Sequence, residues 1–261
     1  MAIAFQTRPA LVAYVTCGDP DLTTTRNVIL AAFDAGAEII ELGVPFSDPV
    51  ADGRVIQRAS DRALGRGTTL KKVLELAADI RRRSQAGLII FSYLNPILQM
   101  GFRRFAQAAA QAGVDGALVT DLPVEEADDY LHEMRMRRLS TIFLAAPTST
   151  DQRLEKIAQS ANGFVYAVSR TGVTGAQERL LDDARQLVIR LRRFSRLPIA
   201  VGFGISTPAQ FVGVGEFAEA AVVGSAIVET IEQNPGREPE AVREFINRLF
   251  LARPPSSAKM V

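Results

Sequence analysis

Residues 88–120 read LIIFSYLNPILQMGFRRFAQAAAQAGVDGALVT, and this stretch decides the expected fold. It begins and ends on short apolar runs, Leu88–Ser92 and Gly116–Thr120, which have the length of β-strands. Between them, the segment FRRFAQAAAQAG repeats apolar residues at three- and four-residue spacing, which is typical of an amphipathic helix. Because strands that are apolar almost throughout need cover on both faces, the stretch predicts parallel strands packed under helices.

The same alternation of a short apolar run and a helical segment extends along the whole chain. A second helical segment, for example, reads LKKVLELAADIRR from residue 70. The expected strands are Leu11–Thr16, Glu38–Gly43, Leu88–Ser92, Gly116–Thr120, Thr141–Ala145, Phe164–Ser169, Pro198–Gly202 and Ala220–Gly224.

Eight such units in a chain of 261 residues fit a closed (β/α)₈ barrel, or TIM barrel, of parallel strands. The alternative is an open doubly wound sheet, which usually carries a GxGxxG fingerprint after its first strand. Here the first run leads into TCGDP at residues 16–20 instead. We therefore expect one barrel domain over residues 1–261, with a short extra helix at Ala226–Ile231 after the last strand. The tail Arg253–Val261 is expected to be flexible.

The composition gives no sign of a nucleic-acid or membrane partner. The net charge is +1, so the chain has no strong field of one sign. No apolar run reaches the roughly 20 residues that a membrane-spanning helix needs, and the N-terminal residues lack the pattern of a signal peptide. Cys17 is the only cysteine, which excludes an internal disulfide and suits a reducing compartment. These features predict a cytoplasmic protein.

Reactive side chains are few. His132 is the only histidine, and it lies in a polar helical stretch where we interpret it as a surface residue. No lysine stands at the end of an expected strand, which argues against a Schiff-base aldolase. No group of His, Asp and Glu has the spacing of metal ligands, and so we expect no metal site. Carboxylate acid–base chemistry remains.

Glu41 is the charged residue inside the expected strand EIIELG at residues 38–43. Strand alternation directs Glu41 and Gly43 to one face, and Ile40 and Leu42 to the other. Since the aliphatic pair suits the helix layer, Glu41 is expected to point into the barrel near its C-terminal mouth. Burial would raise the pKa of this carboxyl toward neutrality and prepare it for proton transfer. The alternative is a structural glutamate, but no lysine or arginine on a strand is available to pair with it.

Two connections that follow strands are long, and both are expected at the C-terminal face of the barrel, where active sites form. One runs from Pro45 to Thr69 and the other from Arg170 to Glu178. The first contains Asp52 within the sequence SDPVADG. Although such a sequence is by itself a turn signal, its place above Glu41 predicts two carboxyls in different environments, with separate pKa values and roles.

Glycines cluster after three expected strands. They occur in GFGIS at residues 202–206, in Gly224-Ser225 before the short extra helix, and in GVTG at residues 172–175. Glycine lets backbone N–H groups approach an anion closely, and a helix N-terminus adds a favourable dipole. Barrels often bind phosphate at the loops after strands seven and eight. The joint placement predicts a phosphorylated substrate.

At these residues the sequence resembles the tryptophan synthase alpha subunit family. The resemblance extends over residues 9–250, and its longest motif is specific because it spans seventeen positions. The matching motifs, in chain order, are ELGVPFSDPVADGxxIQ at 41–57, DLPVEE at 121–126, SRTGVTG at 169–175, GFGIS at 202–206 and VGSAIV at 223–228.

The resemblance implies a carbon–carbon lyase of tryptophan biosynthesis, which cleaves indole-3-glycerol phosphate by retro-aldol chemistry to indole and glyceraldehyde 3-phosphate. Protonation of the indole ring at C3 makes the ring the electron sink, and so this chain would need no cofactor of its own. The resemblance further implies an α₂β₂ heterotetramer, in which indole passes through a tunnel to a beta subunit that carries pyridoxal phosphate.

The resemblance also implies residue roles. Glu41 would move the protons at the indole carbon and at the side-chain hydroxyl, and Asp52 would contact the indole N–H. The matching binding positions are Gly175, Gly204, Gly224 and Ser225 for the phosphate, Tyr166 and Asp121 for the lining of the site, Ile56 and Phe203 for the walls around the indole, and Thr174 for closure over Asp52.

Three departures from the family pattern stand out. Arg54 follows ADG where the family usually has proline, which leaves φ free and places a cation two residues from Asp52. The segment before the first strand is too short for the extra N-terminal helix of many members, and so we expect a more open barrel floor and a less stable fold. Cys17 is interpreted as a packing residue. The alternatives kept open are a stand-alone lyase, a catalytically weak subunit that activates a partner, and another phosphate-binding barrel such as a sugar-phosphate isomerase.

Overall fold

The computed structural model describes residues 5–168, 177–202 and 204–252, and these form a closed parallel barrel in which each strand pairs with the next and β8 pairs with β1. The predicted fold class is confirmed, and each predicted strand lies within about one residue of an observed one. The strands are β1 Ala10–Thr16, β2 Ile39–Gly43, β3 Gly87–Ser92, β4 Gly116–Val119, β5 Ser140–Ala145, β6 Val165–Val168, β7 Ile199–Gly202 and β8 Ala220–Val223.

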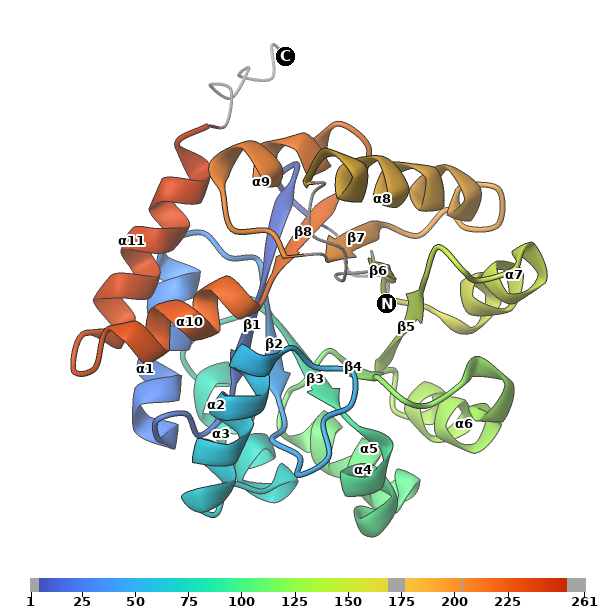
Figure 1. Ribbon diagram of the computed structural model, residues 1–261. Helices are drawn as coiled ribbons and strands as arrows, with labels where there is room; N and C mark the ends of the chain where they lie inside the picture. Colours follow the sequence, from blue (N-terminus) through green and yellow to red (C-terminus); the bar gives the residue numbers. More distant parts are fainter. Residues whose placement is uncertain (1–4, 169–176, 203, 253–261) are drawn as a thin grey trace, which may run out of the picture.

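Helices surround the barrel as an outer ring (Figure 1), and the predicted extra helix after β8 is present as α10. The helices are α1 Leu22–Asp34, α2 Arg54–Gly65, α3 Leu70–Arg81, α4 Leu94–Met100, α5 Phe102–Gln111, the 3₁₀ turn η1 Val124–Glu126, α6 Asp128–Met136, α7 Asp151–Ser160, α8 Gln177–Leu191, α9 Pro208–Gly215, α10 Ser225–Gln233 and α11 Glu238–Phe250.

Side-chain alternation along the strands gives the protein two cores. Outward-facing residues such as Ile40 and Leu42 pack with the helices in the larger core. Inward-facing residues such as Val12, Ile39 and Ile89 fill the barrel in a second core. The strand interiors are therefore buried on both faces, as the near-continuous apolar runs predicted.

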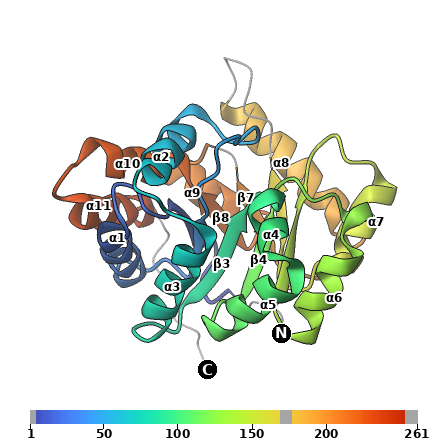
Figure 2. The same ribbon diagram turned by 90° about the horizontal axis from the view of Figure 1, so that it is seen from below.

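The connection from Pro45 to Thr69 is not one long loop, because it contains α2, Arg54–Gly65. The prediction was wrong on this point. The helix fully buries only the small residues Ala59, Ser60 and Ala63, whereas its larger apolar residues Val55 and Ile56 are only partly buried. The loop that remains runs over residues 44–53, and Figure 2 shows it with α2 at one end of the barrel.

The segment before β1 closes part of the barrel floor. The ring of Phe5 packs against Phe164 inside the barrel, with 5.9 Å between ring centroids. The Gln6 and Thr7 N–H groups donate to the Glu38 carboxylate at 2.7 and 2.9 Å. A short segment of bends and turns thus covers part of the end of the barrel that lies opposite the expected site.

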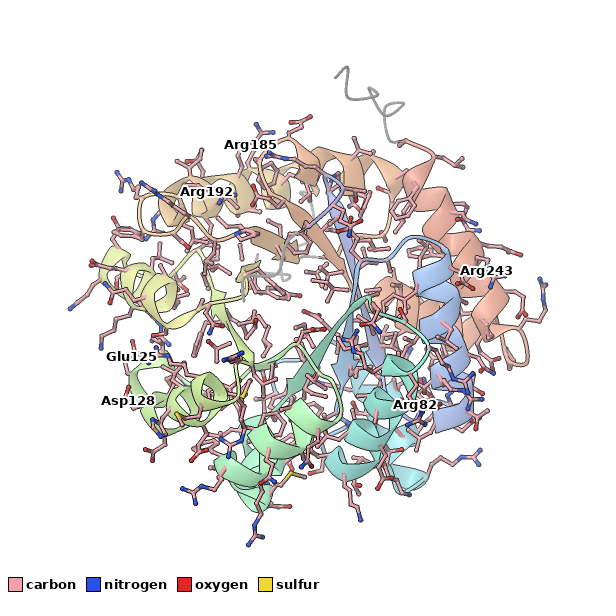
Figure 3. All side chains as sticks on the ribbon, turned by 180° about the vertical axis from the view of Figure 1, so that it is seen from behind. Arg82, Glu125, Asp128, Arg185, Arg192 and Arg243 are labelled. Atoms are coloured by element: carbon pink, nitrogen blue, oxygen red, sulfur yellow. The ribbon has the colours of Figure 1, made fainter. Side chains whose placement is uncertain are left out.

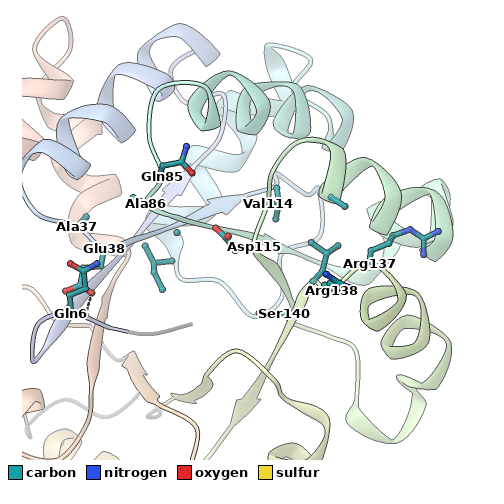
Figure 4. A pocket seen from close by; sticks show the side chains of 14 residues that line it. Gln6, Ala37, Glu38, Gln85, Ala86, Val114, Asp115, Arg137, Arg138 and Ser140 are labelled. Atoms are coloured by element: carbon teal, nitrogen blue, oxygen red, sulfur yellow. Dashed lines mark hydrogen bonds between the residues drawn. The ribbon is translucent and has the colours of Figure 1, made fainter. Parts of the chain in front are cut away.

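A cavity of about 720 Å³ remains beside this segment, at the N-terminal ends of β2 to β5 (Figure 4). Its lining includes Glu38, Asp115 and Arg138. The two carboxylates already have partners, because Glu38 accepts from the N-terminal segment and Asp115 accepts from the Leu88 N–H at 2.8 Å. Part of the barrel floor is therefore hollow at this point.

Charged side chains lie around the outside of the helical ring (Figure 3), and many are paired. Arg185 lies 2.6 Å from Glu216, and Arg82 lies 2.8 Å from Asp79. This interspersed charge agrees with a net charge of +1. Among the described residues, no helix is long and apolar enough to cross a membrane.

Candidate active site

Glu41 lies fully buried inside the barrel on β2, in register with Tyr14 on β1 and Ile89 on β3. Within the described part of the chain, neither of its carboxyl oxygens has a hydrogen-bond partner. Burial raises the pKa of this carboxyl to about 8, because a charge in a dry interior lacks solvation. Glu41 therefore holds a proton at neutral pH and can give it up to a bound substrate.

Tyr14 and Tyr166 share the interior with Glu41, and glycines on the neighbouring strands make room for them. A Cβ at Gly43 would collide with the Tyr14 hydroxyl, and one at Gly202 would collide with the Tyr166 hydroxyl. Burial raises the pKa of both phenols well above its usual range, and the charges of Glu41 and Asp52 raise it further. The two tyrosines thus lie within electrostatic reach of both carboxyls.

Asp52 lies in the 44–53 loop, where Tyr93 at the end of β3 holds it. The Tyr93 hydroxyl donates to Asp52 Oδ2 at 3.1 Å and accepts from the Ala51 N–H at 2.9 Å. Partial burial raises the pKa of Asp52 to about 6, although the hydrogen bond from Tyr93 lowers it. Asp52 is therefore mostly ionised at neutral pH, and its surroundings differ from those of Glu41, as predicted.

The apolar wall of the site joins α2 to β1 and α10. Val55 and Ile56 of α2 pack with Tyr14 and Val228 in one cluster, which also includes Phe91 of β3. Tyr14, a member of this cluster, lies in register with Glu41, so the cluster connects Ile56 to the strand pair that carries the candidate acid.

Part of the expected phosphate site lies within the residues that the structure describes. Gly224 is the N-cap of α10 and Ser225 is its first residue, exposed to solvent. Gly204, after β7, is also exposed and has a positive φ of 41° that favours glycine. A helix N-terminus with free N–H groups suits an anion. Thr174, Gly175 and Phe203 lie outside the described residues.

Asp121 lies after β4 and is exposed, with one carboxylate oxygen in use. Its Oδ1 accepts from the Leu94 N–H at the start of α4 at 2.6 Å. The structure therefore places Asp121 beside Tyr93, the residue that holds Asp52.

The sequence interpretation missed Tyr14 and Tyr93. Tyr14 falls on the inward face of its strand, in an apolar run that predicted only core packing. Tyr93 directly follows a predicted strand end, which is a position where barrel enzymes place functional residues. That position was the one signal that could have identified it.

Comparison with known proteins decides the family. The sequence pattern of the family described as Tryptophan synthase alpha chain matches residues 2–251. The chain belongs to the tryptophan synthase alpha chain family. The tryptophan synthase alpha chain of Solibacter usitatus is 52% identical over 229 residues, which cover 88% of this chain and 86% of the relative. That of Neisseria meningitidis serogroup B is 46% identical over 241 residues, 92% of each chain.

Solved structures of family members have the same fold. A chain from the tryptophan synthase α₂β₂ complex of Pyrococcus furiosus has a TM-score of 0.89 and 40% identity, and the match covers 95% of this chain and 99% of that one. The alpha subunit from Legionella pneumophila has a TM-score of 0.86 and 35% identity, with 94% and 92% covered. As a family member, the chain is a lyase of tryptophan biosynthesis that cleaves indole-3-glycerol phosphate to indole. Membership argues against the sugar-phosphate isomerase alternative.

Proposed function

We propose that Glu41 and Asp52 are the catalytic residues of this cleavage, with opposite protonation states at the start of the reaction. The observation that carries the proposal is the buried Glu41 carboxyl, which has no hydrogen-bond partner among the described residues and a pKa raised to about 8. A buried acid without a partner is costly unless a ligand uses it. Asp52, with a pKa of about 6, supplies the negative charge.

The proton balance of the reaction suits one residue acting twice. Protonated Glu41 donates to C3 of the indole ring, which leaves the ring as a cationic indolenine and Glu41 as a carboxylate. The carboxylate then takes the proton of the side-chain hydroxyl. As the C–O bond becomes a carbonyl, the bond between C3 and the side chain breaks, and its electron pair returns to the ring. Indole and the aldehyde form, and Glu41 again carries a proton.

Asp52 stabilises the intermediate in this scheme. Its ionised carboxylate accepts a hydrogen bond from the indole N–H. It also offsets the positive charge that the ring gains on protonation at C3. We further propose that the substrate phosphate binds at Gly204 and at the N-terminus of α10, on Gly224 and Ser225, with Gly175 beside them. Ile56 and Phe203 would enclose the ring, Tyr166 and Asp121 would line the site, and Thr174 would close over Asp52.

A beta subunit is the proposed partner. The support is family membership together with the α₂β₂ complex of the Pyrococcus furiosus relative. Two exposed apolar side chains lie on segments that follow the C-terminal ends of β2 and β3, Val50 in the 44–53 loop at 88% exposure and Leu98 in α4 at 51%. Pyridoxal phosphate would belong to that partner, and we propose that this chain works without a cofactor, in the cytoplasm.

Release of indole from indole-3-glycerol phosphate, with and without a beta subunit, tests the function. We expect slow cleavage alone and faster cleavage with the partner. High activity alone that a beta subunit does not change would favour the stand-alone lyase. If this chain alone cleaves the substrate negligibly, and the Glu41→Gln variant still activates a beta subunit, the alternative of a catalytically weak activating subunit is favoured. No indole under either condition would overturn the proposal.

The partner surface needs its own variant. Leu98→Asp is expected to weaken activation by the beta subunit and to leave basal cleavage unchanged, because Leu98 lies on α4 outside the proposed chemistry. Met136→Asp is the matched control, since Met136 is 69% exposed on α6. Equal activation of the two variants would contradict this docking face.

A further inference from the structure

Tyr93 contacts the candidate catalytic loop at two adjacent residues with a single hydroxyl group. It donates its proton to Asp52 Oδ2 at 3.1 Å and accepts from the Ala51 N–H at 2.9 Å. The tyrosine is only 2% exposed, and its ring stacks on Phe46, with centroids 5.1 Å apart and planes at 30°. It therefore touches both the beginning and the end of the 44–53 loop.

The backbone around Tyr93 is fixed as well. The residue directly follows β3 and is the N-cap of α4. The next backbone N–H, that of Leu94, donates to Asp121 Oδ1 at 2.6 Å. Tyr93 thus links two neighbouring strand ends to the loop, and its hydroxyl position follows from the barrel framework rather than from the loop itself.

The contact gives the two carboxylate oxygens of Asp52 different surroundings. Oδ2 receives the Tyr93 hydroxyl, whereas Oδ1 has no hydrogen-bond partner within residues 5–168, 177–202 and 204–252. Catalysis by a carboxylate requires one oxygen aimed at the substrate and a fixed orientation of the whole group. A donor on Oδ2 meets this need, because it holds the plane of the carboxylate and favours its ionised form.

We propose that Tyr93 is the positioning residue for Asp52. It fixes Oδ2 and the loop backbone so that Oδ1 accepts a hydrogen bond from the indole N–H of the substrate. This inference rests on the proposed function of Asp52 and assigns the residue that makes that function possible. Tyr93 itself does not touch the substrate in this account.

Tyr93→Phe tests the proposal, because it removes the hydroxyl and keeps the ring that stacks on Phe46. We expect kcat/KM for indole-3-glycerol phosphate to fall about ten- to a hundredfold, the usual effect of losing a hydrogen bond to a charged group. Tyr130→Phe is the matched control. This tyrosine is likewise 2% exposed. Its hydroxyl donates to the Ala117 carbonyl at 3.2 Å, away from the loop, so this variant should keep wild-type kcat/KM.

The pH profile separates positioning from a merely structural role. The Tyr93 hydrogen bond lowers the pKa of Asp52, and so its loss should move the acid limb of kcat/KM to higher pH. The other titratable groups that act on this region are Tyr14, Tyr166, Glu41 and Asp121, and Tyr93→Phe leaves all of them in place. A uniform drop in kcat/KM with an unmoved limb would overturn the proposal, as would a wild-type profile.

A double-mutant cycle distinguishes this proposal from the proposed function. In an Asp52→Asn background, Tyr93→Phe should cause no further loss of kcat/KM, because the carboxylate it positions is gone. If the losses of kcat/KM in the two single variants multiply in the double variant, the positioning role of Tyr93 is overturned, and the proposed function of Asp52 stands. If Asp52→Asn itself retains wild-type kcat/KM, the proposed function of Asp52 fails instead. Thermal unfolding of each variant checks that the fold is kept.

Discussion

Glu41 and Asp52 carry the same functional group, but the fold holds them in opposite ways. Glu41 sits on a strand hydrogen-bonded on both sides, in a dry interior, with no partner for its oxygens within the described residues. Asp52 sits in a loop, half-buried, with the Tyr93 hydroxyl on one oxygen. Desolvation therefore raises the pKa of Glu41 to about 8 and that of Asp52 only to about 6. A rigid, dry setting keeps the Glu41 carboxyl protonated at neutral pH, whereas a hydrogen-bond donor and partial solvation keep the Asp52 carboxyl ionised.

The largest expected effect comes from removing the acid. Glu41→Gln should lower kcat for indole release by about a thousandfold or more, because no other described side chain can give and retake the proton. Glu38→Gln is the matched control, since Glu38 lies just before the same strand at the floor of the barrel. Steady-state indole release measures both. Substantial activity in Glu41→Gln would contradict the role of Glu41 as the proton donor.

The same substitution should stabilise the fold at neutral and higher pH. A carboxyl with a folded pKa of about 8 and an unfolded value of 4.5 binds more protons when folded, so wild-type stability falls as pH rises through that window. At pH 7 the difference in free energy of unfolding amounts to about 3 kcal/mol in favour of Glu41→Gln, and it vanishes near pH 4. Urea unfolding at both pH values measures it. A variant less stable than wild type at pH 7 would contradict the burial argument.

The helix behind Asp52 can be loosened through its ion pairs. Arg62 of α2 donates to both oxygens of the buried Asp19 at 2.7 and 2.8 Å and to Glu232 of α10 at 2.7 Å. Arg62→Ala should lower the free energy of unfolding by about 2 kcal/mol, because it leaves a buried carboxylate unpaired. Arg58→Ala, whose exposed guanidinium pairs with Glu232 alone, should cost clearly less than Arg62→Ala, because solvent screens an exposed ion pair. Equal losses in chemical denaturation would contradict this assignment.

The smallest expected effect concerns Arg54, the first residue of α2. It is exposed, and a cation at a helix N-terminus opposes the helix dipole. Because proline is well tolerated at this position, Arg54→Pro should raise stability by at most about 1 kcal/mol. It should change KM by less than about threefold. Thermal unfolding and KM for indole-3-glycerol phosphate check this, and a large rise in KM would show that loop closure needs the arginine.

Much of the fold was predictable because its signals are local. Each apolar run became a strand, and alternation within EIIELG placed Glu41 inside the barrel. The missing parts depend on contacts between distant residues. Tyr93 and Asp52 are 41 positions apart, and no spacing rule joins them. Helix α2 fully buries only small side chains, and its sequence lies between two turn signals that led us to expect a loop. Thr174, Gly175 and Phe203 remain predictions, as do the roles of Glu41 and Asp52.

The pH dependence of kcat/KM for indole release by the wild-type chain tests the central claim most directly. If Asp52 must be ionised and Glu41 protonated, kcat/KM should rise as pH increases through about 6, fall as it increases through about 8, and peak between these values. Asp52→Asn should abolish the acid limb, and the alkaline limb should persist. A profile that stays flat from pH 5 to pH 9, or one whose alkaline limb is lost in Asp52→Asn, would contradict the account.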